Sequence, residues 1–258
     1  YTLLSRVFGF VRDILIASVL GAGGIADAFF LALRLPNLFR RLFAEGALAA
    51  AFVPIFTKIL EQNGRDQARA FAEQVFSVLI LILAFFVAFI ELVMPWVMIG
   101  LAPGFAGVPG KMELATEMSR IAFPYILFIS VVSIQSGILN ALGRFAAAAA
   151  APILFNFVLI IALLGFSNYL ETPGHVLSWG VFLAGLLQFF WLTWNCRSVG
   201  FPFQFHWPEL TEKVKLLGAR ILPVVFGTSL YQINLLIGTI LATLVADGAV
   251  SYLYYADR

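Results

Sequence analysis

The chain has 258 residues, of which 62% are hydrophobic and 12% are charged. An ordinary soluble domain is roughly 45 to 50% apolar and about 25% charged, so this composition excludes a water-soluble globular protein. The net charge is +2, and the 16 Lys and Arg residues are spread along the chain instead of forming one basic face. That spread argues against a nucleic-acid partner.

Residues that could bind a metal or form a disulfide are isolated in the sequence. Cys196 is the one cysteine, which permits no internal disulfide and no cysteine-based metal site. His175 and His206 stand without a histidine or carboxylate partner at ligand spacing. We therefore expect no metal site, no cofactor and no enzyme active site.

Apolar runs interrupted by glycine, proline and charge clusters divide the chain into membrane-spanning helices. One span of the ~30 Å hydrocarbon layer takes about 20 residues. In chain order we expect spans at 1–20, 26–60 with bends near Pro36 and Pro54, 71–100, 114–142, 148–169, 176–195 and 218–246, and a further helix from about 249. The expected fold class is an all-α integral membrane protein, a polytopic helix bundle.

One segment, 208–217, is expected to lie on the membrane surface. It begins with Pro208 at a first helical position and places Leu210, Val214 and Leu217 on one stripe. Lys213 and Lys215 suit the cytoplasmic face of the membrane.

Basic residues in alternate loops predict the orientation, because Lys and Arg concentrate on the cytoplasmic side. The loops that carry them hold Lys58, Arg65, Arg69, Arg144, Arg197, Lys213, Lys215 and Arg220. The turns near Gly21, Pro103, Pro173 and Gly248 hold one basic residue among them, Lys111. We therefore expect a cytoplasmic N-terminus, with these four turns on the opposite side.

Charged residues are frequent in the first 60 positions, within segments apolar enough to enter a membrane. They are Arg6, Arg12, Asp13, Asp27, Arg34, Arg40, Arg41 and Glu45. A charge at the centre of a spanning helix costs at least about 2.5 kcal/mol, so such residues usually face a partner or a wet cavity. All five basic residues are arginines, whose planar fork binds phosphate in a bidentate way. The pattern favours a cationic cavity for a phosphate-bearing ligand.

Two alternatives to the cavity remain open. Arginines near helix ends can extend to the membrane interface at low cost. Structural ion pairs are the other alternative, since on an ideal helix Arg6 shares a face with Asp13, and Asp27 with Arg34.

A short internal repeat supports a transporter. Gly24, Asp27 and Arg34 have the same spacing as Gly248, Ser251 and Arg258, at an offset of 224 residues. Six helices per unit give both copies the same orientation, as in transporters built from parallel repeats. We expect a six-helix lobe at 1–200, a cytoplasmic linker at 201–217 with the surface helix, and the start of a second lobe at 218–258. The alternative is a chance similarity between two apolar segments.

Several motifs resemble one family. The Ser-Arg-Val-Phe-Gly-Phe-Val-Arg-Asp run at 5–13, the Ala-Asp-Ala-Phe-Phe run at 26–30 and the Arg-Arg-Leu-Phe-Ala-Glu-Gly run at 40–46 are similar to the MurJ (MviN) family of bacterial lipid II flippases. That family belongs to the multidrug, oligosaccharidyl-lipid and polysaccharide exporter superfamily, with two six-helix lobes around a central cavity. The resemblance implies that this chain is about the first half of such a protein.

The resemblance also implies residue roles. The family's cavity arginines match Arg6, Arg12, Arg40 and Arg258, and its cavity acid matches Asp27. Asn37 and Ser251 fall on polar cavity positions, and Arg34 stands where the family often has Lys. All eight residues are expected to bind substrate.

The expected function is that of a transporter, not an enzyme. The resemblance implies that it moves lipid II, the undecaprenyl-diphosphate-linked peptidoglycan precursor, from the inner to the outer leaflet of the bacterial cytoplasmic membrane by alternating access. Lipid II, membrane lipids and the cell-wall synthesis machinery are the expected partners. The alternatives are an exporter of another lipid-linked oligosaccharide, a cation-coupled drug exporter of the same superfamily, a membrane enzyme acting on polyprenyl phosphates, and a non-transporting scaffold.

Overall fold

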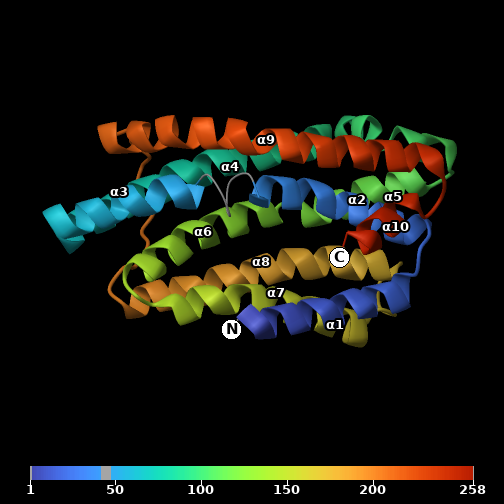
Figure 1. Ribbon diagram of the computed structural model, residues 1–258, viewed down its shortest axis with the longest axis horizontal. Coiled ribbons are helices and arrows are strands. Elements are labelled where there is room, and N and C mark those ends of the chain that lie inside the picture. The colour runs from blue at the N-terminus through green and yellow to red at the C-terminus, as the bar shows by residue number, and fades with distance from the viewer. Residues whose placement is uncertain (1, 42–47, 258) are drawn as a thin grey trace.

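In the computed structural model, the chain forms a bundle of helices that lie along one long axis (Figure 1). The structure describes residues 2–41 and 48–257, and no strand occurs within these ranges. The elements in chain order are α1 (Thr2–Leu20), α2 (Gly24–Phe39), α3 (Leu48–Asn63), α4 (Arg65–Leu101), η2 (Pro103–Gly107), α5 (Lys111–Ala122), α6 (Tyr125–Ala141), α7 (Phe145–Phe166), α8 (Pro173–Ser198), α9 (Glu212–Val245) and α10 (Ala249–Ala256).

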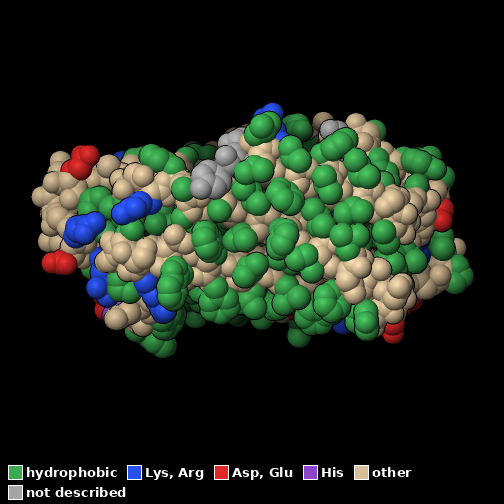
Figure 2. Space-filling view, turned by 90° about the horizontal axis from the view of Figure 1, so that it is seen from below, with side chains coloured by type: hydrophobic (Ala, Val, Ile, Leu, Met, Phe, Trp, Pro, Cys, Tyr) green, Lys and Arg blue, Asp and Glu red, His purple; other side chains and the backbone are tan. Residues whose placement is uncertain are grey.

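The helices and the outer surface are those of a membrane protein. Four segments are long and apolar enough to cross a membrane, namely α4, the α5–α6 pair, α7 and α8, and α9 is a fifth if its two halves, bent by 49°, count as one span. Large apolar side chains such as Phe85, Trp96 and Trp194 are exposed. Figure 2 shows hydrophobic side chains along one face, with charged side chains gathered toward its ends. Such a surface suits lipid tails.

Two of the expected spans are each described as two helices. The span expected at 26–60 is described as α2 and α3, with Pro36 and Pro54 inside them, and residues 42–47 lie outside the described ranges. The span expected at 114–142 divides into α5 and α6 around Pro124. A proline has no N–H to continue the helical ladder, which explains a break there.

The start of α9 corrects the surface helix expected at 208–217. The first helical residue is Glu212, and α9 extends from there to Val245. The side chain of Thr211 accepts a hydrogen bond from the Val214 N–H at 3.4 Å, so Thr211, and not Pro208, begins the helix. Thr is among the residues preferred at this position because its hydroxyl satisfies a free N–H of the first turn.

Two residues of the expected stripe are buried against protein. Val214 and Leu217 belong to an apolar cluster built around Phe52, Phe56 and Phe71 of α3 and α4. Leu210, the third residue of the expected stripe, is 65% exposed. The linker and the first turns of α9 therefore pack on the bundle.

The two ends of the bundle differ in charge, as the loop pattern predicts. The turns before α2, α5, α8 and α10 lie together at one end, which we call the far end (Figure 1). The loops between α3 and α4, α6 and α7, and α8 and α9 lie together at the other, which we call the basic end (Figure 1). The helices run alternately between the two ends, as expected from the sequence (Figure 1), and of the expected spans those at 71–100, 114–142, 148–169 and 176–195 are long and apolar enough to cross a membrane, with 218–246 a fifth if the bent α9 counts as one.

At the far end, α9 packs tightly on η2. The N–H of Gly104 points to the Thr243 hydroxyl at 3.4 Å, and a Cβ at position 104 would lie 1.8 Å from the carbonyl oxygen of Thr243. Only glycine permits this approach of two backbones.

Gly104→Ala is therefore expected to separate η2 from α9 and to destabilise the protein by about 1 to 3 kcal/mol, the usual cost of overpacking. Gly107→Ala in the same short helix is the matched control, since a Cβ there meets nothing within 4 Å. The midpoint of thermal unfolding in detergent, lowered in the first variant and unchanged in the second, checks this. Equal midpoints would contradict the packing argument.

Candidate functional site

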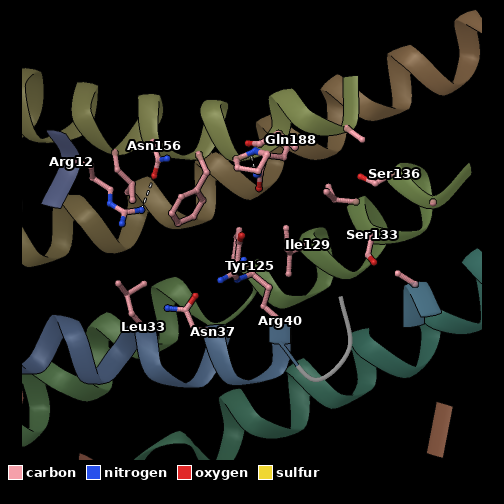
Figure 3. Close-up of a pocket in the computed structure, with 18 of the residues that line it drawn as sticks. Arg12, Leu33, Asn37, Arg40, Tyr125, Ile129, Ser133, Ser136, Asn156 and Gln188 are labelled. Atoms are coloured by element: carbon pink, nitrogen blue, oxygen red, sulfur yellow. Dashed lines mark hydrogen bonds between the residues drawn. The ribbon is translucent and has the colours of Figure 1, made fainter. Parts of the chain in front are cut away.

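A cavity with a volume of about 390 Å³ lies inside the bundle, and we call it the larger cavity. It is lined by parts of α1, α2, α3, α6, α7, α8 and α10. Figure 3 shows Arg12 with Asn156 on one side and Asn37 with Arg40 on the other, with Tyr125 between them. Two arginines thus reach the same space from opposite walls.

Hydrogen bonds fix the position of Arg12. Its Nη1 donates to Oδ1 of Asn156 at 2.7 Å, and its Nε and Nη2 both donate to Oδ1 of Asp13, at 3.0 and 2.6 Å. Asn156 in turn donates to the carbonyl of Ser5 at 3.1 Å, which ties α7 to α1. The guanidinium also lies 5.9 Å from the ring centroid of Phe155. A guanidinium held in this way needs little reorganisation to meet an anion.

Polar side chains that carry no charge complete this cavity. They are Asn37, Ser133, Ser136, Asn140, Asn156 and Gln188. Gln188 donates from Nε2 to the carbonyl of Ala151 at 2.7 Å, while its buried Oε1 has no hydrogen-bond partner among the described residues. Such an acceptor is suited to a ligand hydroxyl.

A smaller cavity of about 150 Å³ adjoins the first and shares Asn37, Arg40 and Tyr254 with it. Arg34 and Arg41 line it together with residues of α9. The Nε of Arg34 donates to the hydroxyl of Thr239 at 2.7 Å, and its Nη2 to the carbonyl of Leu235 at 3.5 Å. Arg34 therefore connects α2 to α9.

The two cavities together are cationic. Arg12, Arg34, Arg40 and Arg41 line them, against two carboxylates: Asp257 in the smaller cavity, and Asp13, which pairs with Arg12 at 2.6 Å. No carboxylate is among the described residues that line the larger one. Since a low-dielectric wall strengthens such a field, the site attracts anions, and the arginine forks suit phosphate oxygens.

A buried carboxylate closes the far end. Asp27, in the first turn of α2, is fully buried and accepts four hydrogen bonds. They come from Nζ of Lys111 at 2.8 Å, the N–H of Gly248 at 2.7 Å, and the N–H and hydroxyl of Ser251 at 2.8 and 2.6 Å. Lys111 also pairs with Asp247 and lies 4.2 Å from the ring centroid of Phe105. We call Asp27, Lys111, Asp247, Gly248 and Ser251 the Asp27 cluster.

The Asp27 cluster uses two helix N-termini. The carboxylate lies in the first turn of α2 and binds N–H groups of the first turn of α10, where the helix dipoles favour a negative charge. Gly248 makes this possible, because it has φ of 85° and begins α10 in the left-handed conformation.

Equivalent positions of the expected repeat contact each other. Asp27 binds Ser251, and the ring of Phe30 stacks on Tyr254 with centroids 3.9 Å apart; both pairs are separated by the repeat offset of 224 residues. Residues that meet their own equivalents lie near a two-fold axis. The contact between α2 and α10 thus supports the repeat.

The structure brings together some of the predicted site residues and separates others. Arg12, Asn37 and Arg40 line the larger cavity, and Arg34 the smaller one. Asp27 and Ser251 line neither and instead bond to each other. Arg6 is exposed on α1 and lines neither cavity. Arg258 and Glu45 lie outside the described residues.

The alternative of structural ion pairs placed Asp27 with Arg34 and Asp13 with Arg6. In the structure, Asp27 pairs with Lys111, and Asp13 pairs with Arg12. Sequence analysis missed Lys111 as a site residue, although it is the single basic residue in the turns of the far end.

Comparison with known proteins identifies related chains. The family model described as lipid II flippase MurJ matches residues 16–258. The probable lipid II flippase MurJ of Rhizobium meliloti is 46% identical over the whole chain, and the lipid II flippase MurJ of Burkholderia cenocepacia is 38% identical. The chain covers 49% and 51% of these two proteins, so it spans about half the length of the curated relatives it matches.

Solved structures agree with the fold. A lipid II flippase MurJ in an inward closed conformation superposes with a TM-score of 0.79 at 26% identity, over 100% of this chain and 52% of that one. An inward-facing multidrug resistance transporter of the MATE family gives a TM-score of 0.71 at 17% identity, over 57% of that chain. The second match indicates a shared fold.

Asp27→Asn is expected to loosen the far end, because it removes the charge from a buried ion pair, at a cost of about 3 to 5 kcal/mol. The test uses a cysteine introduced at Val250, which is 4% exposed on α10. In the Asp27→Asn variant this cysteine is expected to react with a thiol reagent at least roughly tenfold faster than it does with Asp27 present, because each 1.4 kcal/mol or so of lost stability raises the population of the open state about tenfold. Native Cys196 is buried and sets a low background.

The matched control is Asp247→Asn, which removes the exposed partner of the same lysine. Asp247 has a side chain that is 57% exposed, so its pair with Lys111 contributes only about 0 to 1 kcal/mol. A labelling rate that rises equally in both variants would contradict the leading role of Asp27.

Proposed function

The chain belongs to the MurJ family of lipid II flippases, and from that membership we propose that it forms about half of a transporter that moves lipid II from the inner to the outer leaflet of the bacterial cytoplasmic membrane. The cavity holds the diphosphate and sugar headgroup during transfer. The polyprenyl tail stays in the lipid outside the bundle.

One observation carries this proposal: Arg12 and Arg40 face one cavity that has no carboxylate among its described lining residues. A diphosphate brings negative charges and several acceptor oxygens to both arginines, and each guanidinium can bind two oxygens at once. The neutral amides and hydroxyls around them, including the unpaired Oε1 of Gln188, suit the hydroxyl and amide groups of a sugar.

Alternating access requires that the two ends open in turn. The far end is closed by the Asp27 cluster and by the stack of Phe30 on Tyr254. A bound diphosphate neutralises the charge of the cavity arginines, which then repel each other less. The cavity walls can therefore approach each other, and the conformation that is closed at the basic end becomes more favourable. The contacts between α2 and α10 must then break for the headgroup to leave at the far end.

The orientation belongs to the same proposal. The basic end faces the cytoplasm by the distribution of Lys and Arg, so α1 runs from the cytoplasmic side toward the far end, and the N-terminus is cytoplasmic. The far end is the periplasmic side. The division into a lobe at 1–200, a linker at 201–217 and the start of a second lobe at 218–258 stays a prediction, as do contacts with cell-wall synthesis enzymes.

A cation-coupled drug exporter is the alternative within the same superfamily. A site for cationic drugs needs carboxylates facing the cavity, and the described lining of the larger cavity holds arginines instead. The electrostatics therefore favour an anionic substrate.

Arg12→Ala and Arg40→Ala in the full-length protein are each expected to lower the amount of lipid II exposed on the outer leaflet roughly tenfold or more, since losing a charge-assisted hydrogen bond costs about 1.5 to 3 kcal/mol. The variant Arg12→Lys is expected to expose more lipid II than Arg12→Ala but less than the wild type, because lysine cannot bind two phosphate oxygens with a planar fork. Lipid II at the outer surface of cells depleted of their native flippase is the measurement.

Arg197→Ala is the control, because Arg197 is exposed in the last turn of α8 and lines neither cavity. Unchanged exposure of lipid II in both cavity variants, with protein present at normal levels, would overturn the proposed function.

A further inference from the structure

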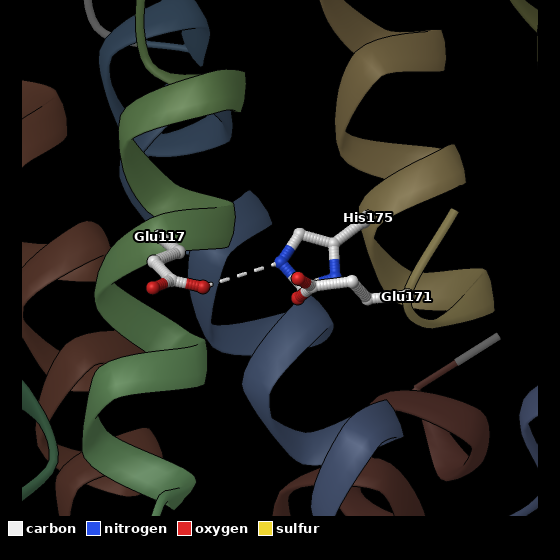
Figure 4. A group of neighbouring side chains, drawn as sticks. All are labelled: Glu117, Glu171 and His175. Carbon is white, nitrogen blue, oxygen red and sulfur yellow. Dashed lines mark ion pairs between the residues drawn. The ribbon is translucent and has the colours of Figure 1, made fainter.

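A cluster of possible metal ligands lies at the far end, away from both cavities. Glu117 comes from α5, Glu171 from the turn before α8, and His175 from the first turn of α8 (Figure 4). Their ligand atoms all lie within 4.8 Å of one another. His175 has no carboxylate partner at ligand spacing in the sequence, but folding brings two carboxylates to it.

The imidazole of His175 is buried and held in one orientation. Its Nδ1 lies 2.9 Å from the hydroxyl oxygen of Thr172, which also accepts a hydrogen bond from the N–H of His175 at the start of α8. Its Nε2 faces the carboxylates and lies 3.5 Å from Oε2 of Glu117. A histidine that binds a metal almost always donates its other ring N–H to an oxygen, which fixes the tautomer and directs the free lone pair.

The residue types are those of a zinc site with an open position. Zinc accepts histidine nitrogen and carboxylate oxygen at about 2.0 to 2.2 Å, and three protein ligands plus water are common around it. Ligand atoms in a tetrahedral site are then about 3.3 Å apart, close to the 3.5 Å between His175 and Glu117. Glu171 and Glu117 are exposed, so their side chains can close the remaining distance without moving the helices.

We propose that Glu117, Glu171 and His175 bind one divalent transition-metal ion, with zinc as the ion that best fits one imidazole and two carboxylates. Magnesium prefers oxygen ligands and octahedral geometry, and the buried imidazole disfavours it. The two carboxylates carry a charge that the metal neutralises. Without the metal, Nε2 of His175 still lies 3.5 Å from Oε2 of Glu117.

The metal would join α5 to the beginning of α8. Since α5 also carries Lys111 of the Asp27 cluster, the bound ion restrains the helix that supports the closed far end. The proposal does not depend on lipid transport, because it rests on residues outside both cavities.

Metal-dependent stability of the full-length protein in detergent tests the site. After removal of metal by a chelator, added zinc chloride is expected to raise the midpoint of thermal unfolding of the wild type, because a ligand that binds only the folded state stabilises it. Magnesium chloride is expected to leave the midpoint unchanged. Titration calorimetry with zinc gives the stoichiometry, expected to be one ion at this site.

The variants His175→Gln and Glu117→Gln are expected to weaken zinc binding at least tenfold and to remove the shift in the midpoint. Glu113→Gln is the matched control, because Glu113 is an exposed glutamate one turn earlier on α5. Zinc binding by the two ligand variants equal to that of the wild type, or a wild type whose midpoint does not respond to zinc, would overturn the proposal. A Glu113→Gln variant that loses zinc binding would do the same.

Discussion

The buried carboxylate of Asp27 is the interaction on which the arrangement of the bundle depends. A charge with no exposure to water is stable only if its oxygens are fully hydrogen-bonded and a counter-charge is near, and Asp27 obtains both from two other parts of the chain. Lys111 supplies the counter-charge from α5, and Gly248 and Ser251 supply N–H groups from α10. Asp27 is the one carboxylate of α2, and the hydrogen bonds that it accepts bring α2, α5 and α10 together at the far end.

That convergence determines the form of the cavity. With the far end closed, the arginines of α1 and α2 face a space between the helices α1 to α8 and the α9–α10 hairpin. The pairing of Asp27 with Ser251 and of Phe30 with Tyr254 places equivalent positions of the repeat against each other. The contact between α2 and α10 consists of a few hydrogen bonds and one aromatic stack, which can break together. Such a contact is better suited to a gate than a broad apolar interface is.

Hydropathy predicts the spans well, because the hydrocarbon layer sets their length and leaves few alternatives. The position of Arg12 and Arg40 at a cavity was predictable as well, because an arginine in an apolar segment needs polar surroundings. Partners were not predictable: helix spacing can pair Asp27 only with a residue on its own helix, whereas Lys111 comes from a distant turn. The surface helix at 208–217 was wrong because periodicity does not distinguish a stripe facing lipid from one packed on Phe56. His175 shows the same limit, since Glu117 reaches it only through folding.

The central claim is that anion binding between the arginines opens the contact made by Asp27. Spin labels at Ile25 of α2 and Tyr252 of α10, both exposed at the far end, report the distance between these helices in the full-length protein. The account predicts that lipid II lengthens this distance in the wild type and not in a variant lacking both Arg12 and Arg40. A distance that does not respond to lipid II, or that lengthens equally without the two arginines, would contradict it.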